Sequence, residues 1–248
     1  GNYDEAILIA VKELRNNKTK KGNQEYIVML EEAFSKAVAK DLEGILFLKK
    51  DGNPANLETI YNAYLKLKNR QELIKPLLPL PIHSKAKNAK FSFTDYSNEI
   101  LTAKTKLSEY LYSTAKKLLF SSSNKLDYRD AFNDLSYLDK INPNFKDTRS
   151  LLDEAHFKGT NFVFVTLQNI SDKVIPMRLE EDLLNFDTYK LNDLWTVYHN
   201  KEQAKTNYDF KIEINFREIN ISPEQVREKQ VIKEKQVVDG WKYLIDKN

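Results

Sequence analysis

Apolar residues recur three and four positions apart through the first 157 residues, and this spacing limits the fold more than any other feature. Segment 3–14 shows it in Ala6, Ile7, Ala10, Val11 and Leu14. Such spacing places the apolar side chains on one face of a helix. The same pattern returns in further segments, namely 24–50, 57–67, 95–119, 126–138 and 147–157. The sequence therefore predicts a succession of amphipathic helices that bury their stripes against one another.

Proline and glycine divide this helical region. Asp51, Gly52, Asn53 and Pro54 form a strong stop after the second helix. Pro76, Pro79 and Pro81 interrupt the apolar stretch 73–80, because proline cannot extend a helix. We expect a linker at 83–90, within a break at 81–92. Gly159 has the position of a helix C-terminal cap.

The periodicity changes after residue 158. Segment 162–167 is short, aromatic and β-branched, which is typical of a strand. Helix is expected over 176–197. Segment 208–221 then alternates as a half-buried strand, with one face formed by Tyr208, Phe210, Ile212, Ile214 and Phe216. A hairpin is expected over 231–245, because Asp239–Gly240 suits a tight turn.

These patterns predict a mainly α protein with an α+β C-terminal module. Residues 1–157 form the helical domain, and residues 158–248 form a small strand–helix–strand–hairpin domain that we expect to continue past Asn248.

Two stretches resemble the second helix of a tetratricopeptide repeat, a helix–turn–helix unit of about 34 residues. The first is 128–132, followed by Leu135, Leu138 and the closing segment 142–144. The second is 3–7. Segments 57–67 and 71–77 are interpreted as a third helix pair. The resemblance implies a degenerate array of helical hairpins, whose surfaces bind a protein partner.

The Lys-, Asn- and Tyr-rich composition, with segments 139–147 and 237–241, resembles envelope lipoproteins of Bacteroidota-type bacteria. This resemblance implies a periplasmic or membrane-anchored protein of the bacterial cell envelope. It also implies a lipidated cysteine upstream of Gly1. The cytoplasm is the alternative location.

Composition and charge argue against several classes of protein. The chain has 39 basic and 36 acidic residues, for a net charge of +3. Nucleic-acid-binding domains carry a larger, clustered excess, so no nucleic-acid partner is expected. The chain has no cysteine, which excludes disulfides and thiol catalysis within it. No apolar run approaches the about 20 residues of a membrane-spanning helix.

No motif points to catalysis. His83, His156 and His199 are far apart in sequence and lack the spacing of a helical metal site. Acidic pairs such as Asp153 and Glu154 are adjacent, so on a helix they point in different directions. Phosphate-binding glycine loops and nucleophile elbows are absent from the sequence. We therefore predict no catalytic residue, metal or cofactor.

Two groups of aromatic residues are candidate partner-binding sites. Tyr61, Tyr64 and Lys68 lie at the edge of their helix's apolar stripe and could line a concave groove. Trp195 and Tyr198 could form a recognition surface, since large aromatics with a polar tip contribute much of the energy at interfaces. The competing interpretation is that Trp195 and Tyr198 pack against the strand at 208–216.

The preferred functional hypothesis is a non-catalytic, envelope-associated scaffold or protein-interaction module. The first alternative is a small-ligand or glycan-binding module that uses the aromatics near Trp195. The second alternative is an enzyme whose site is assembled from distant residues.

Overall fold

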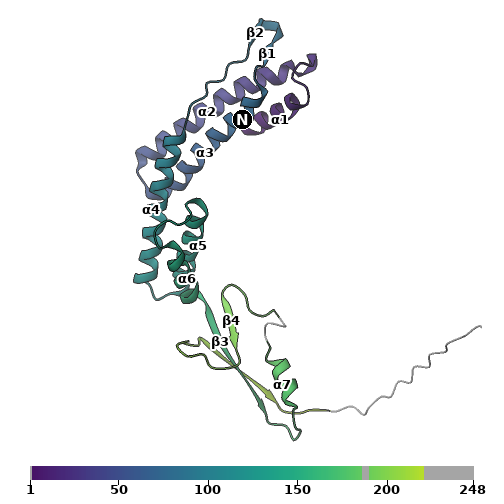
Figure 1. Cartoon of the computed structure of the whole chain (residues 1–248), viewed down its shortest axis with the longest axis vertical. Helices are drawn as coiled ribbons and strands as arrows, with labels where there is room; N and C mark the ends of the chain where they lie inside the picture. The colour runs from purple at the N-terminus through teal and green to yellow at the C-terminus, as the bar shows by residue number, and fades with distance from the viewer. Residues whose placement is uncertain (1, 186–189, 221–248) are drawn as a thin grey trace, which may run out of the picture.

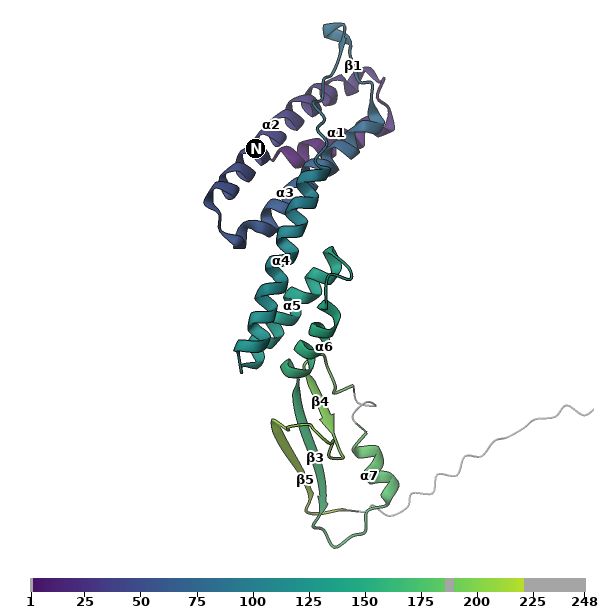
Figure 2. The ribbon, with the colours of Figure 1, turned by 60° about the vertical axis from the view of Figure 1, so that its left-hand side comes forward.

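The computed structural model describes residues 2–185 and 190–220. It is an elongated molecule with packed helices at one end and a small sheet at the other (Figures 1 and 2). The long helices are α1 (Tyr3–Asn16), α2 (Gln24–Asp51), α3 (Leu57–Ile74), α4 (Ser97–Ser121), α5 (Lys125–Ile141) and α6 (Thr148–Gly159). Each packs against the helix before it in sequence. The expected succession of packed helices is confirmed.

The helical part has two hydrophobic clusters, joined by α2. Ile27, Leu30 and Phe34 from the first half of α2 pack with α1 and the segment after α3. Ile45, further along α2, belongs instead to the second cluster, whose other buried members come from the segment between Ile60 and Ala155. Val38 touches both clusters. The 28 residues of α2 therefore form a common wall for the two clusters.

The segments between helices are more ordered than expected. Three-residue 3-10 turns occur at η1 (Lys21–Asn23), η2 (Pro54–Asn56), η3 (Lys75–Leu77) and η4 (His83–Lys85). The expected linker lies in a small hairpin of β1 (Pro81–Ile82) and β2 (Lys87–Asn88). Ile82 and Ala89 are buried in the first cluster, because their apolar side chains reach the face of α2.

The expected helix pair at 57–67 and 71–77 is wrong. The backbone continues as a single helix from Leu57 to Ile74, and the stop comes at the η3 turn that contains Pro76. Gln71 explains why no break occurs earlier. It is buried, and its side-chain amide exchanges hydrogen bonds with the backbone of Thr94.

The C-terminal part is a parallel three-stranded sheet. Its central strand is β3 (Asn161–Asn169), with β4 (Thr196–His199) on one side and β5 (Phe210–Phe216) on the other. Strands were expected at 162–167 and 208–221, and strands are confirmed in both segments, although the second ends at Phe216. Helix over 176–197 is wrong: α7 covers only Met177–Leu183, and Thr196–His199 is a strand. Pairing with Asn161–Phe164, far away in sequence, gives that short segment its extended form.

The apolar stripe of β5 is more exposed than a half-buried strand would be. Phe210, Ile212 and Ile214 are 59%, 43% and 36% exposed. On the same sheet face, Val163 and Val165 of β3 are buried, because Leu184 and Tyr198 pack against them. The side chains that cover this face of β3 thus do not extend over β5. The expected hairpin at 231–245, and part of the expected helix at 186–189, lie outside the described residues.

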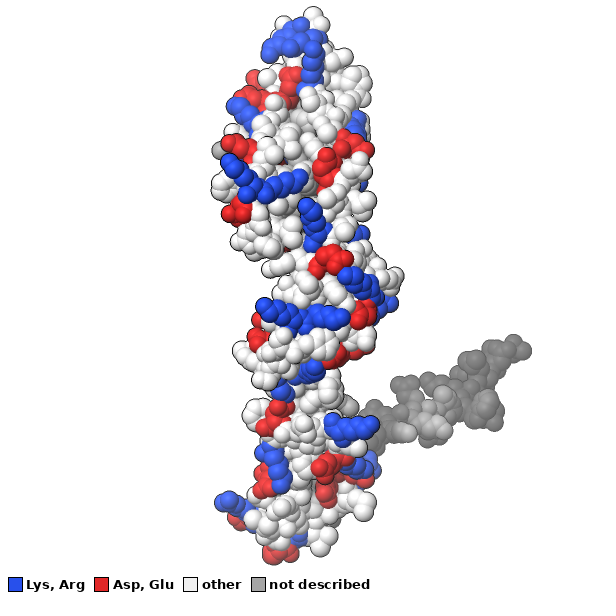
Figure 3. Space-filling view, turned by 90° about the vertical axis from the view of Figure 1, so that its left-hand side faces the viewer, with Lys and Arg blue, Asp and Glu red and all other residues white. Residues whose placement is uncertain are grey.

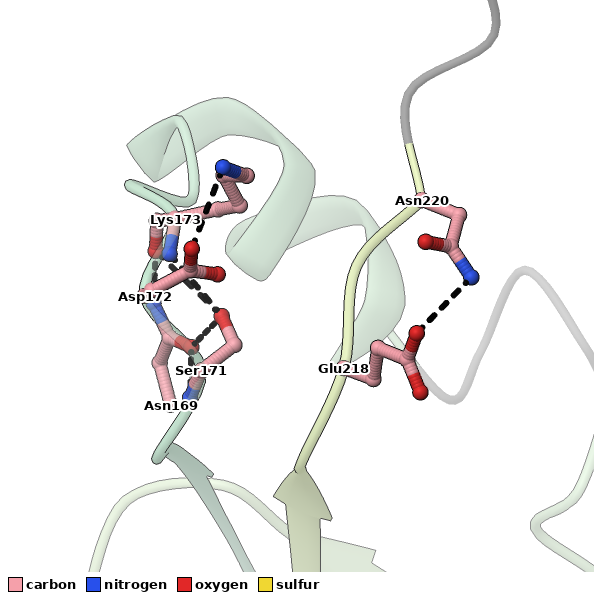
Figure 4. Close-up of polar contacts among 6 residues, drawn as sticks. All are labelled: Asn169, Ser171, Asp172, Lys173, Glu218 and Asn220. Atoms are coloured by element: carbon pink, nitrogen blue, oxygen red, sulfur yellow. Dashed lines mark hydrogen bonds and ion pairs between the residues drawn. The ribbon is translucent and has the colours of Figure 1, made fainter.

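A hydrogen-bonded turn follows the sheet (Figure 4). The side chain of Asn169 accepts hydrogen bonds from the backbone N–H and the hydroxyl of Ser171, and its amide donates to the carbonyl of Lys173. Just past β5, Asn220 donates a hydrogen bond to Glu218 over 3.2 Å. Each of these contacts joins residues that are close in sequence.

Candidate functional site

The candidate binding site in the described part of the chain is a groove of about 480 Å³ where α4 crosses the α2–α3 hairpin. Its apolar lining comes from Leu48, Pro54, Leu57, Ile60 and Ala103, and its polar lining from Lys49, Asn53, Tyr64, Asn98, Glu99, Thr102 and Lys106. This mixture suits a guest that has an apolar body and polar groups at its edge.

Local sequence shapes the part of the groove that is lined by the α2–α3 turn. Gly52 ends α2 in the left-handed conformation, with φ of 68°, which glycine adopts at little cost. The side chain of Asn53 then accepts a hydrogen bond from the N–H of Ala55 over 3.0 Å, and Pro54 starts the η2 turn. Together these residues reverse the chain so that α3 returns along α2.

Tyr64 links the groove to the helical core. Its side chain is only 5% exposed, and its hydroxyl accepts a hydrogen bond of 2.8 Å from the ammonium of Lys49. That ammonium lies 5.0 Å from the centre of the Tyr64 ring, within the range of a cation–π contact. Lys49 is thereby held at the groove wall.

Charges of both signs border the groove. Lys49 and Lys106 are exposed, whereas Glu99 is half-buried. One carboxylate oxygen of Glu99 is buried with no hydrogen-bond partner among the described residues. An unpaired buried oxygen costs free energy. A small adjustment of Glu99 toward a hydrogen-bond donor on a guest would recover part of that cost.

The first group of predicted site residues is divided by the structure. Tyr61 is buried in the core of the helical part, and Tyr64 lines the groove. Lys68 lies one turn further along α3, exposed beside a separate shallow hollow with Phe93 and Tyr96. Only Tyr64 of these three residues therefore belongs to the groove.

Sequence reasoning missed the charged and polar residues that α2 and α4 supply to the groove. Lys49, Glu99 and Lys106 lie on the polar faces of their helices, where charges usually only face solvent. A weak signal was available at Gly52–Asn53–Pro54, since a sharp turn forces the ends of two helices together. The crossing of α4 over that turn involves residues about 50 positions apart and leaves no local pattern.

Trp195 anchors the sheet module to the helices. Its ring lies 5.1 Å from Phe132 and 5.6 Å from His156, between centroids, and the guanidinium of Arg129 lies 5.1 Å from the ring centre. The backbone carbonyl of Trp195 accepts a 2.8 Å hydrogen bond from the N–H of Asn161. The interpretation that Trp195 packs against the strand at 208–216 is therefore wrong, because its ring contacts Phe132 of α5 and His156 of α6.

Tyr198, by contrast, stays within the sheet module. It lies in β4 opposite Val163, half-buried, and packs on the small core of that sheet. Its backbone N–H donates a 2.9 Å hydrogen bond to the side chain of Asn192. Trp195 and Tyr198 thus serve different contacts, and the structure does not bring them together into one aromatic surface.

At Gly159 the backbone of α6 comes close to the ring of Trp195. The expected position of Gly159 as the C-terminal cap is wrong, because it is the last residue of α6, without a positive φ, and Thr160 is the cap. A Cβ at this position would lie 2.8 Å from Cζ3 of Trp195 and 3.1 Å from Cγ of Arg129. The sequence has glycine here because the Trp195 ring occupies the space of a side chain.

An ion pair reinforces the junction. The ammonium of Lys125, at the start of α5, lies 2.5 Å from a carboxylate oxygen of Asp209 and also contacts the carbonyl of Thr160. Burial alone would raise the pKa of Asp209. The hydrogen bonds from Lys125 and the N–H of Phe162 outweigh it and hold that pKa below the ordinary value.

A second group of charges lies where α3 and α5 face each other. Burial, together with the nearby carboxylates of Asp130 and Glu58, raises the pKa of Asp134 to about 6. Burial also raises the pKa of Tyr137, with a further contribution from Glu58. These residues are outside the lining of the groove.

Comparisons with known proteins found no match among protein-family models, curated proteins or solved structures. Within residues 2–185 and 190–220, no cluster of three or more histidine or acidic side chains is placed to hold a metal ion. None of the described helices combines the length and hydropathy needed to cross a membrane. On the face drawn in Figure 3, basic and acidic side chains are interspersed along the molecule.

Proposed function

We propose that the protein is a non-catalytic, envelope-associated scaffold module whose groove between α2, α3 and α4 holds a segment of a protein partner. The groove is the observation that carries this proposal. Its walls join apolar side chains such as Leu57 and Ile60 to charged groups of both signs.

The size of the groove fits one or two apolar side chains of a partner. Fully burying a leucine-sized side chain contributes about 1.5–3 kcal/mol. Lys49 and Lys106 would pair with acidic groups of the bound segment, and Glu99 would accept a hydrogen bond from it. Opposite charges on the rim would thus set the orientation of the segment, while the apolar wall would supply most of the affinity.

Filling the groove tests this proposal. Thr102 is exposed on α4 and lines the groove, whereas Thr105 is exposed on the same helix outside it. With a partner isolated from the native envelope, Thr102→Trp should weaken binding at least about tenfold, which corresponds to about 1.4 kcal/mol. Thr105→Trp should bind as the wild type does. Equal effects of the two variants would contradict the proposal.

A small ligand in the same groove is the second candidate function. A volume of about 480 Å³ lies within the range of about 300–1,000 Å³ that is common for small-molecule sites. Binding beside Trp195 has less support, because Phe132, His156 and Arg129 already contact its ring. Native mass spectrometry separates the two functions: a small ligand adds a discrete mass that Thr102→Trp removes.

A further inference from the structure

Strand β5 leaves one side of the sheet open. The strand order is β4-β3-β5, so β5 hydrogen-bonds to β3 on its inner side, and no described strand pairs with its outer side. Figure 2 shows β5 as the outer strand of the sheet, with α7 away from its free edge. An open edge presents unpaired backbone donors and acceptors, which can pair with another strand.

The side chains of β5 make this edge unusual. Phe210, Ile212 and Ile214 form an exposed apolar stripe on one face. On the other face, Lys211 and Glu213 are 58% and 46% exposed and pair with each other over 2.7 Å. Natural edge strands are commonly protected by charge, proline or short length. Here the charges all lie on one face, and the apolar stripe on the other is unprotected.

The charge pattern is self-complementary in one antiparallel arrangement. If two copies of β5 pair about Ile212, each Lys211 lies opposite Glu213 of the other copy. The same arrangement places Phe210 opposite Ile214, so apolar side chains from both copies form one stripe. Both opposite-charge pairs and both aromatic–aliphatic pairs are favourable across neighbouring strands.

The neighbouring arrangements are unfavourable. Pairing about Lys211 places two lysines opposite each other, and pairing about Glu213 does the same for two glutamates. Like charges directly opposite each other on adjacent strands are destabilising. The sequence of β5 therefore favours the arrangement centred on Ile212 over these two neighbours.

The placement of the described helices is compatible with an antiparallel second copy. The start of β5 lies at the helical end, where Asp209 contacts Lys125 of α5. In an antiparallel pair, the helices of the second copy extend from the opposite end of the sheet. The long helical parts of the two copies would therefore point away from each other, because the helices lie at one end of each copy and the sheet at the other (Figure 1).

We infer that β5 is an interface between two copies of this chain, which pair edge to edge and antiparallel about Ile212. The contact is symmetric, so it closes with two copies and does not continue into a fibre. This interface is distinct from the groove, and it would give the scaffold two grooves, one in the helical part of each copy.

Charge reversal with mixing tests this inference. The average molecular mass of the wild-type protein, measured by light scattering or sedimentation, should rise toward twice 29.0 kDa as the concentration increases. Lys211→Glu alone and Glu213→Lys alone each place like charges across the pair, so the dimer dissociation constant should rise about tenfold or more. An equimolar mixture of the two variants should recover the dimer, because opposite charges meet again.

Lys36→Glu is the matched control. Lys36 forms an exposed ion pair with Glu32 on α2, and its reversal should leave dimerisation unchanged. Far-UV circular dichroism checks that each variant keeps its fold. A wild-type chain that stays monomeric at every concentration overturns the inference, even if another partner is found to bind β5. So does a mixture of the two variants that fails to dimerise.

Discussion

Replacing Gly159 with alanine is predicted to destabilise the protein, although alanine normally stabilises a helix. The new Cβ would lie 2.8 Å from Cζ3 of Trp195, where carbon atoms prefer about 3.5–4.0 Å. The ring cannot move freely, because Phe132 and His156 pack against it. Overpacking of this kind costs about 1–3 kcal/mol, whereas the gain in helix propensity is about 0.5–1 kcal/mol. The expected net loss is about 1–2 kcal/mol.

A double-mutant cycle isolates the contact. In a Trp195→Ala background the obstructing ring is gone, and the remaining neighbour is the flexible side chain of Arg129. Gly159→Ala should then be neutral or stabilise by up to about 1 kcal/mol, so its destabilising effect disappears or reverses. The expected coupling between the two positions is about 2 kcal/mol.

Urea unfolding followed by far-UV circular dichroism measures all four chains, since it does not depend on the tryptophan that is removed. If Gly159→Ala stabilised the wild-type background, or if the coupling were near zero, the assignment of Trp195 to the α5–α6 surface would be refuted.

Two further predictions concern buried charge. Arg70 is 5% exposed and pairs with Asp4 over 2.7 Å and Asp41 over 2.6 Å, so Arg70→Met should lower the free energy of unfolding by about 3 kcal/mol. Lys66→Met, which removes an exposed partner of the same Asp4, should cost less than about 1 kcal/mol in the same urea assay. Asp134→Asn should stabilise the protein by about 1 kcal/mol at pH 8, a figure reduced for the partial exposure of the group. Because the pKa of Asp134 is raised from 3.8 to about 6 in the folded state, the wild type loses stability as pH rises through this interval. The gain from Asp134→Asn should therefore vanish near pH 4, and a gain that is constant with pH would contradict this origin.

Local patterns in the sequence predicted the helical part well. The apolar stripes of 3–14 and 126–138 correspond to helices α1 and α5, with ends extended by a few residues. Periodicity succeeds there because each helix buries one face against its neighbours in sequence. It failed at 71–77, where a buried Gln71 and its hydrogen bonds to Thr94 prolong α3.

Non-local contacts account for the errors in the C-terminal part. Trp195 and Tyr198 have the spacing of a helix face, yet Thr196–His199 becomes a strand through its pairing with β3. Gly159 has the sequence position of a cap, but its true constraint is a tryptophan that lies 36 residues later. In the groove, Tyr64 was identified from its stripe, whereas Glu99 and Lys106 depend on how α4 crosses the α2–α3 hairpin.

Site-specific photo-crosslinking tests the central claim, that the groove receives a protein segment, most directly. A photoreactive residue placed at Asn98, which is exposed on the groove lining, should crosslink one defined protein in cells that make this chain. The same residue placed at Thr105 should not, and Thr102→Trp should abolish the product at Asn98. Equal crosslinking from both positions, or a product at Asn98 that survives Thr102→Trp, would contradict the account.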